Sequence, residues 1–228
     1  EKVVDDEFKS MLNDVDYKLR DEESILSESD RWCKPENLLL RKNLRKKLIS
    51  NNDLHSLIGK EFVSDKISHK CTDYLKNSLH VEDSSNDHLI KCLENEEWVK
   101  GHIDDNDWFH NLYIQIKSEI NVLNQGESKE FCKTLKKLKI FKTTDGKLLS
   151  AETSKIFFSL ADNKKEYSFT EDFELIDKKT FPEAWPEGDN QQFFTELGIK
   201  KENPGCKKNR GCVRIPNDMK YSKYKNVD

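Results

Sequence analysis

The sequence predicts an α+β fold that is predominantly helical, with a small sheet containing a β-hairpin and two loosely repeated parts. Apolar residues recur every three or four positions through most of the first 126 residues, which is the spacing of one helix face. Further along, Asp145 and Gly146 separate two short apolar runs, the pattern of a hairpin turn. A phrase at residues 62–81 also returns in altered form at residues 181–199.

The composition favours an extended folded body with shallow cores. Hydrophobic residues make up 35% and charged residues 36% of the 228 positions, which leaves little apolar surface for one deep core. Aromatic residues still reach 10%, a level typical of folded chains because disordered chains are poor in them. No apolar run approaches the roughly 18–20 residues that cross a bilayer, so we expect no membrane span.

The two ends of the chain carry opposite charge, although the net charge is −4. Acidic residues gather in residues 1–30 and basic residues in 200–228; this pattern fits solvated termini or, alternatively, head-to-tail contact within or between chains. Because no secretory signal is visible, the six cysteines are interpreted as reduced thiols of a cytoplasmic protein, with the nucleus as the alternative. The start at Glu1 without Met suggests a segment of a larger protein.

The first 79 residues are predicted to form helices in succession. Residues 1–28 form the first, whose apolar stripe is Val4, Phe8, Met11, Leu12, Val15 and Leu19. Pro35 begins a second helix that places Leu40, Leu44 and Leu48 on one face and ends at residues 51–53. Short helices around Gly59 continue over residues 54–79.

Two helix starts follow at polar clusters. Residues 84–87 give a loop and an N-cap before an apolar face of Leu89, Ile90, Leu93 and Trp98. Residues 104–107 cap the clearest helix, over residues 108–123, and Gly126 is expected to end it. Trp98, Trp108 and Tyr113 are expected to be core anchors.

The predicted β-hairpin spans about residues 138–150, with the turn at Asp145 and Gly146. Residues 156–160 form a buried strand or a short helix, and helix returns after Phe181 around residues 193–199. The predicted parts are therefore a helical part at 1–126, a second repeat-like part with hairpin and helices at 127–205, and an irregular basic tail at 206–228.

The repeated phrase has an offset of about 119 residues. Phe62, Tyr74 and Leu75 match Phe181, Phe193 and Phe194, and residues 35–40 loosely match 151–156. Chance similarity between amphipathic helices is the alternative explanation.

These motifs carry a family resemblance over about residues 30–200. A helix end at 193–199, the stretch Asp107-Trp108-Phe109 with Leu112-Tyr113, and the hairpin at 139–149 are similar to regions downstream of the ATPase module in sacsin-like and NO VEIN-like proteins. Those are very large intracellular proteins with an HSP90-type ATP-binding fold. The resemblance implies a packing segment, and it carries over no catalytic residue because the ATP-binding signatures have no match here.

Several short motifs suggest chemistry but lack its other parts. Residues 34–40 resemble the end of a protein-kinase catalytic loop, yet the position of the base is Trp32, so a helix start is predicted instead. Residues 104–107 resemble a calcium loop without its later Gly and Glu, so helix capping is predicted.

Candidate metal ligands occur only in pairs. Cys206 and Cys212 are too far apart in sequence for a zinc knuckle; His88 with Cys92, and His102 with His110, lack further ligands placed by the sequence. His69 beside Cys71 is a similar pair. We therefore predict no catalytic residue, no metal and no cofactor.

Partner binding is the remaining candidate function. Trp185 lies between two prolines and is a candidate surface anchor for a partner. Basic candidates are Arg41, Arg45, Lys207, Lys208 and Arg210. The sequence thus predicts a non-catalytic structural or protein-interaction segment, binding protein partners or other domains of the same chain. The alternative is a module for nucleic acid or an anionic surface that uses the basic residues and Tyr221 and Tyr224.

Overall fold

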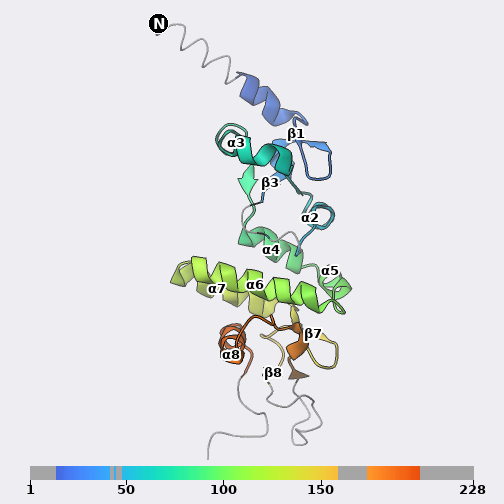
Figure 1. Ribbon diagram of the computed structural model, residues 1–228, viewed down its shortest axis with the longest axis vertical. Coiled ribbons are helices and arrows are strands. Elements are labelled where there is room, and N and C mark those ends of the chain that lie inside the picture. The colour runs from blue at the N-terminus through green and yellow to red at the C-terminus, as the bar shows by residue number, and fades with distance from the viewer. Residues whose placement is uncertain (1–13, 42–43, 45–47, 159–173, 201–228) are drawn as a thin grey trace, which may run out of the picture.

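The computed structural model describes residues 14–41, 44, 48–158 and 174–200. The molecule is elongated, with groups of short strands and helices toward its two ends and a layer of helices across the middle (Figure 1). The predicted α+β class is confirmed, because helices form most of the regular structure and the sheets are small. We call residues 14–83 the first unit and residues 125–200 the second unit.

The first unit combines a hairpin with a small parallel sheet. Its elements are a helix over residues 14–21, β1 (Ile25–Leu26), β2 (Trp32–Cys33), the 3-10 turn η1 (Pro35–Asn37), β3 (Leu38–Leu40), α2 (Asn51–Ile58), β4 (Glu61–Phe62), α3 (Asp65–Asn77) and β5 (Glu82–Asp83). Strands β1 and β2 pair antiparallel. Strand β3 lies between β4 and β5 and runs parallel to both, so helices supply the crossovers.

The helix predicted to start at Pro35 is wrong. The chain makes one 3-10 turn and then enters β3, whose residues Leu38, Leu39 and Leu40 are at most 4% exposed. A central parallel strand is covered on both faces and therefore needs an unbroken apolar run. The first helix also ends at residue 21 instead of 28, and residues 51–53 begin α2 behind the Ser50 cap instead of ending a helix.

The middle layer consists of α4 (Asn86–Leu93), α5 (Glu96–Gly101), α6 (Asn106–Val122) and α7 (Gln125–Lys137), the last of which begins the second unit. The predicted cap at residues 104–107 is confirmed, because the Asp105 carboxylate accepts from the Trp108 amide at 2.9 Å. Gly126 does not end that helix. Asn124 caps α7 by accepting from the amides of Gly126 and Glu127, so the polar cluster starts a helix that the sequence analysis missed.

The second unit repeats the plan of the first. After α7 come β6 (Phe141–Lys142), β7 (Leu148–Leu149), β8 (Ile156–Phe157), β9 (Glu174–Leu175), η3 (Lys178–Thr180) and α8 (Glu187–Glu196). The predicted hairpin is confirmed as β6 and β7, with Gly146 at φ 72° in its turn. Of the two alternatives for residues 156–160, the structure shows the strand, β8, which pairs parallel with β9 and bridges Lys200; residues 159–160 lie outside the described residues.

Matching backbone hydrogen bonds define the duplication. The Ser27 amide donates to the Arg31 carbonyl at 2.8 Å, and the Thr143 amide donates to the Lys147 carbonyl at 2.9 Å. Each hairpin is then tied to the parallel strand that follows. Glu28 N donates to Phe62 O at 2.8 Å, and Thr144 N donates to Leu175 O at 2.9 Å. The counterpart of Phe62 is therefore Leu175 and not Phe181, and the repeat was predicted in the wrong register there.

Corresponding side chains fill corresponding cores. In the first unit these are Ile25, Leu38, Leu40, Val63, Leu75, Leu79 and Val81. Their counterparts in the second unit are Phe141, Ile156, Phe158, Ile176, Phe194, Leu197 and Ile199, which belong to the main core. The match of residues 35–40 to 151–156 is thus displaced, since β3 corresponds to residues 156–158. The match of Tyr74 and Leu75 to Phe193 and Phe194 agrees with the structure. The predicted domain boundaries remain predictions.

Candidate interaction site

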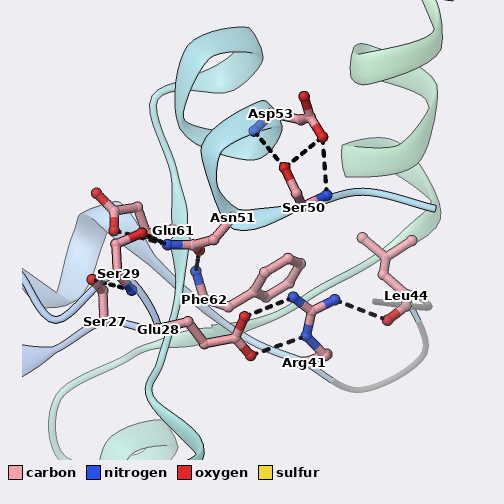
Figure 2. A network of polar contacts seen from close by, with 10 residues as sticks. All are labelled: Ser27, Glu28, Ser29, Arg41, Leu44, Ser50, Asn51, Asp53, Glu61 and Phe62. Carbon is pink, nitrogen blue, oxygen red and sulfur yellow. Dashed lines mark hydrogen bonds and ion pairs between the residues drawn. The ribbon is translucent and has the colours of Figure 1, made fainter. Parts of the chain in front are cut away.

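Arg41, a predicted binding residue, is held inside the first unit (Figure 2). Its guanidinium donates to both carboxylate oxygens of Glu28, at 3.3 and 2.9 Å, and to the Leu44 carbonyl at 3.3 Å. The same group lies 3.5 Å from the centroid of the Phe62 ring, a cation–π arrangement. Both partners of the ion pair keep less than a fifth of their side-chain surface exposed. Arg41 therefore stabilises the fold and presents little charge to a ligand.

Glu61 is the centre of a second polar cluster in the same unit (Figure 2). Its carboxylate is 4% exposed, pairs with Arg31, and lies 3.3 Å from Nδ1 of His55. Asn51 donates to Glu61 at 3.0 Å and accepts from the Phe62 amide at 2.6 Å, and its side-chain amide also donates to Ser29. The cluster fastens α2 to β4 and to the first hairpin. Sequence reasoning missed it because its members lie in separate elements.

The second unit contains a simpler version of this ion pair. Lys147, the counterpart of Arg31, lies 2.9 Å from Glu174, the counterpart of Glu61. The carboxylate of Glu174 keeps 18% of its surface exposed, whereas that of Glu61 keeps 4%. An acid on the strand and a base on the hairpin thus belong to the shared architecture, which indicates a structural role for both pairs.

Trp185, the candidate anchor, lies just before α8 in the second unit. Its indole packs edge-on against Phe193 at 5.1 Å, and the Lys117 ammonium lies 4.2 Å from the ring centroid. Lys117 also reaches Asp189 at 3.4 Å, so one cation joins α6 to the indole and to α8. Trp185 is half-buried and serves first as a packing residue.

A small hollow of about 210 Å³ opens beside this contact, between α6 and α8. It is lined by Lys117, Ile120, Asn121, Asp189, Gln192, Phe193 and Glu196. Its walls carry both positively and negatively charged side chains. Of these, Lys117 and Asp189 already form an ion pair with each other. The volume suits one side chain and not a nucleotide.

The predicted site residues do not converge. Arg41 follows β3 in the first unit, whereas Trp185 precedes α8 in the second, and the helical layer separates the two units (Figure 1). Arg45, Lys207, Lys208 and Arg210 lie outside the described residues, as do Tyr221 and Tyr224. The structure therefore assembles no basic surface from the candidates that it describes.

His88, Cys92 and His102 have packing or capping roles, whereas the side chain of His69 lies outside what the structure describes. His88 accepts from the Ser85 amide at 3.1 Å and completes the cap of α4, and burial lowers its pKa. Burial also raises the pKa of the Cys92 thiol to about 12, which keeps it protonated. Cys206 and Cys212 lie outside the described residues. Within the ranges that the structure describes, no three His, Cys, Asp or Glu side chains gather as metal ligands would.

His102 belongs to an aromatic cluster at the end of α5. Its ring stacks on Trp108 with centroids 4.5 Å apart, and Trp98 meets both rings edge-on. Burial lowers the pKa of His102, since a charged imidazolium loses hydration there. Trp108 and Tyr113 are at most 3% exposed, which confirms them as core anchors; Trp98 is half-buried against the same core.

Exposed aromatic side chains occur on the first unit. Trp32 is 61% exposed, Tyr17 67% and Tyr74 42%, and Val15 nearby in sequence is 50% exposed. A contiguous patch of such side chains can mark an interaction surface, whereas single exposed apolar residues are normal on folded proteins. The sequence analysis did not select them as a surface: it placed Val15 on the apolar stripe of the first helix and considered Trp32 only as the position of a kinase base.

Comparisons with models of protein families, with curated proteins and with solved structures found no match for this chain. None of the helices in the described ranges combines the length and apolar character needed to cross a bilayer. The arguments about function therefore rest on the geometry above.

Proposed function

We propose that this chain is a non-catalytic structural and protein-interaction segment of a large intracellular protein of the sacsin-like or NO VEIN-like kind. The observation that carries the proposal is the duplication, in which hairpin, parallel strands, helix and core recur with the same hydrogen bonds. Proteins built from repeated units use the repeats to hold an extended shape and to present binding surfaces.

The positions shared by the two units support this proposal. Ser27 and Thr143 are both fully buried hydroxyl residues at the start of the hairpin turn, and each accepts from an amide four residues later, that of Arg31 or Lys147. His80 and Gly198 both adopt positive φ after the last helix. Such residues shape the backbone of both units in the same way.

Three of the basic side chains already form ion pairs within the chain. Arg41 is paired with Glu28, Arg31 with Glu61, and Lys117 with Asp189. The alternative function is binding of nucleic acid through the basic residues. For Arg41 this alternative has less support than a structural role, because its guanidinium is already paired with Glu28. Coupling to an ATPase module elsewhere in the parent protein follows from the resemblance and belongs to the same proposal.

Two assays on the purified chain test the proposal. With ATP and Mg²⁺ we expect no phosphate release above the blank, and on filters we expect no retained single-stranded DNA or RNA at low salt. Hydrolysis that co-purifies with the protein through successive columns contradicts the proposal. Nucleic-acid binding that falls steeply between low and moderate salt favours the alternative instead.

A further inference from the structure

Three corresponding positions have opposite exposure in the two units. Val15, Trp32 and Tyr74 of the first unit are 50%, 61% and 42% exposed. Their counterparts in the second unit are Phe131, Leu148 and Phe193. Phe131 is 6% exposed, Phe193 is 2% exposed, and Leu148 packs partly buried against the main core. These three positions are thus buried or partly buried in the second unit and exposed in the first.

The correspondence follows from backbone geometry. Trp32 pairs with Leu26 across the first hairpin as Leu148 pairs with Lys142 across the second. The preceding helix ends four residues before the first strand in both units, at residues 21 and 137, which aligns Val15 with Phe131. At the end of the last helix, Leu79 N donates to Tyr74 O and Leu197 N donates to Phe193 O, both at 3.2 Å.

Helix α6 covers this side of the second unit. Its Tyr113 ring lies 6.1 Å from Phe193, and its Lys117 pairs with Asp189 of α8. Asn106 accepts from Lys142 of the hairpin at 3.0 Å, and His110 contacts the Lys179 carbonyl at 2.8 Å. One amphipathic helix therefore contacts the hairpin, η3 and α8 together.

Among the described residues, no helix takes this place on the first unit. Helix α4 packs against α2, which in turn contacts β4. On this side of the first unit, Leu39 and Phe62 belong to the main core. The uncovered side is nevertheless ordered, because the Tyr74 hydroxyl bonds Asp16 at 2.6 Å and Arg20 donates to the Ser78 carbonyl at 2.7 Å. These contacts hold the helix at 14–21 against α3.

We propose that Val15, Trp32 and Tyr74 form a docking face for an amphipathic α-helix of a partner protein, which binds the first unit as α6 binds the second. The partner helix carries an apolar stripe at the spacing of α6, whose own stripe is Phe109, Leu112, Tyr113, Ile116 and Ile120. Trp32 is the expected anchor, because aromatic side chains that become buried dominate such interfaces. The inference rests on the proposed interaction function and assigns that function to a specific surface of the first unit.

The test uses the complete chain and a fluorescein-labelled peptide with the sequence of residues 106–122. Isolated helices of this length are marginal in water, so a staple joins positions 118 and 122, which are exposed in α6. We expect a saturable rise in fluorescence anisotropy. The double variant Trp32→Ser with Tyr74→Ser should weaken binding by about tenfold or more.

Tyr17→Ser is the matched control. Tyr17 is also a highly exposed aromatic residue, but its counterpart Lys133 stays exposed in the second unit, so it lies off the docking face. This variant should bind the peptide as the unchanged chain does, and circular dichroism of both variants verifies folding. Absence of saturable binding, or equal binding by the double variant, overturns the proposal.

Sedimentation velocity separates a second copy from a partner helix. A concentration-dependent dimer that disappears in Trp32→Ser means that the face binds another copy of the chain, and it overturns the assignment to a partner helix. A monomer that binds the peptide supports it. Neither result changes the expected absence of ATP hydrolysis, so failure of the docking face and failure of the proposed function are distinguishable.

Discussion

Individual side chains show how the fold uses its charge. Charged residues are mostly exposed in folded proteins and are rarely buried unless they are paired. Arg41 combines the bidentate contact to Glu28 with stacking on Phe62. The planar guanidinium makes both contacts at once, which an ammonium group cannot do.

Replacing Arg41 tests this directly. Arg41→Met should lower the free energy of unfolding by about 1–3 kcal/mol, because it removes the cation that faces a mostly buried carboxylate. The control is Lys66→Met, which removes a pair with Asp30 in which both side chains are more than 70% exposed. That variant should change stability by less than about 0.5 kcal/mol. Urea unfolding measures both, and equal effects would contradict the assignment.

His102 makes stability depend on pH. Burial lowers its folded pKa below the ordinary value, with Asp53 and Asp105 opposing the shift. The unfolded chain therefore binds more protons as the pH falls, so the contribution is complete above about pH 6.5 and is lost below it. Between pH 7.5 and 5.5 the melting temperature should fall less in His102→Phe than in the unchanged chain. A parallel pH dependence in the variant would be the contrary result.

At the scale of elements, turn chemistry decides where sequence reasoning succeeds. The second hairpin was predicted because Gly146 supplies the positive φ of its turn, whereas the first was missed because Asp30 holds that position with φ 55°. Leu38–Leu40 were misassigned since a short apolar run fits a buried strand and a helix equally well. The contact between Lys117 and Trp185 was unpredictable, because it joins residues 68 positions apart in sequence.

The two turns give a reciprocal prediction. Gly146→Asp should destabilise the chain by about 1 kcal/mol, since a side chain at positive φ is strained. Asp30→Gly should relieve the same strain in the first unit and cost less, even though it removes the exposed pair with Lys66. No heavy atom lies within 4 Å of a Cβ built at Gly146, so steric overlap does not confuse the comparison. Thermal unfolding of the two variants decides whether the turns are equivalent.

The cap of α7 is an element that sequence reasoning assigned to the wrong helix. Asn124→Ala removes two hydrogen bonds to helix amides and half of a capping box, so it should cost about 1 kcal/mol. Asn121→Ala, an exposed position three residues earlier near the end of α6, is the control and should change little. Chemical denaturation that ranks the two variants in the opposite order would contradict the assigned helix start.

At the scale of the whole molecule, the repeat was visible in the sequence but its register was not. The aromatic phrase at the end of each unit keeps nearly the same spacing in both units, with Tyr74 and Leu75 matching Phe193 and Phe194. The parallel strands do not keep this spacing. The number of positions that separates a residue from its counterpart in the second unit differs between the hairpin, β3 and β4, because segments of different length connect these elements. Hydrogen bonds preserve the equivalence where the sequence has drifted.

Amide hydrogen exchange tests the central claim, that this chain is one structural unit used twice. The relevant pairs are Ser27 with Thr143, Val63 with Ile176, and Ser64 with Asp177, whose amides donate to equivalent carbonyls in the two units. We expect slow exchange at both members of each pair, since all of these amides are bonded within the hairpin and sheet framework. Protection of the members in only one unit, with rapid exchange of their counterparts, would contradict the account.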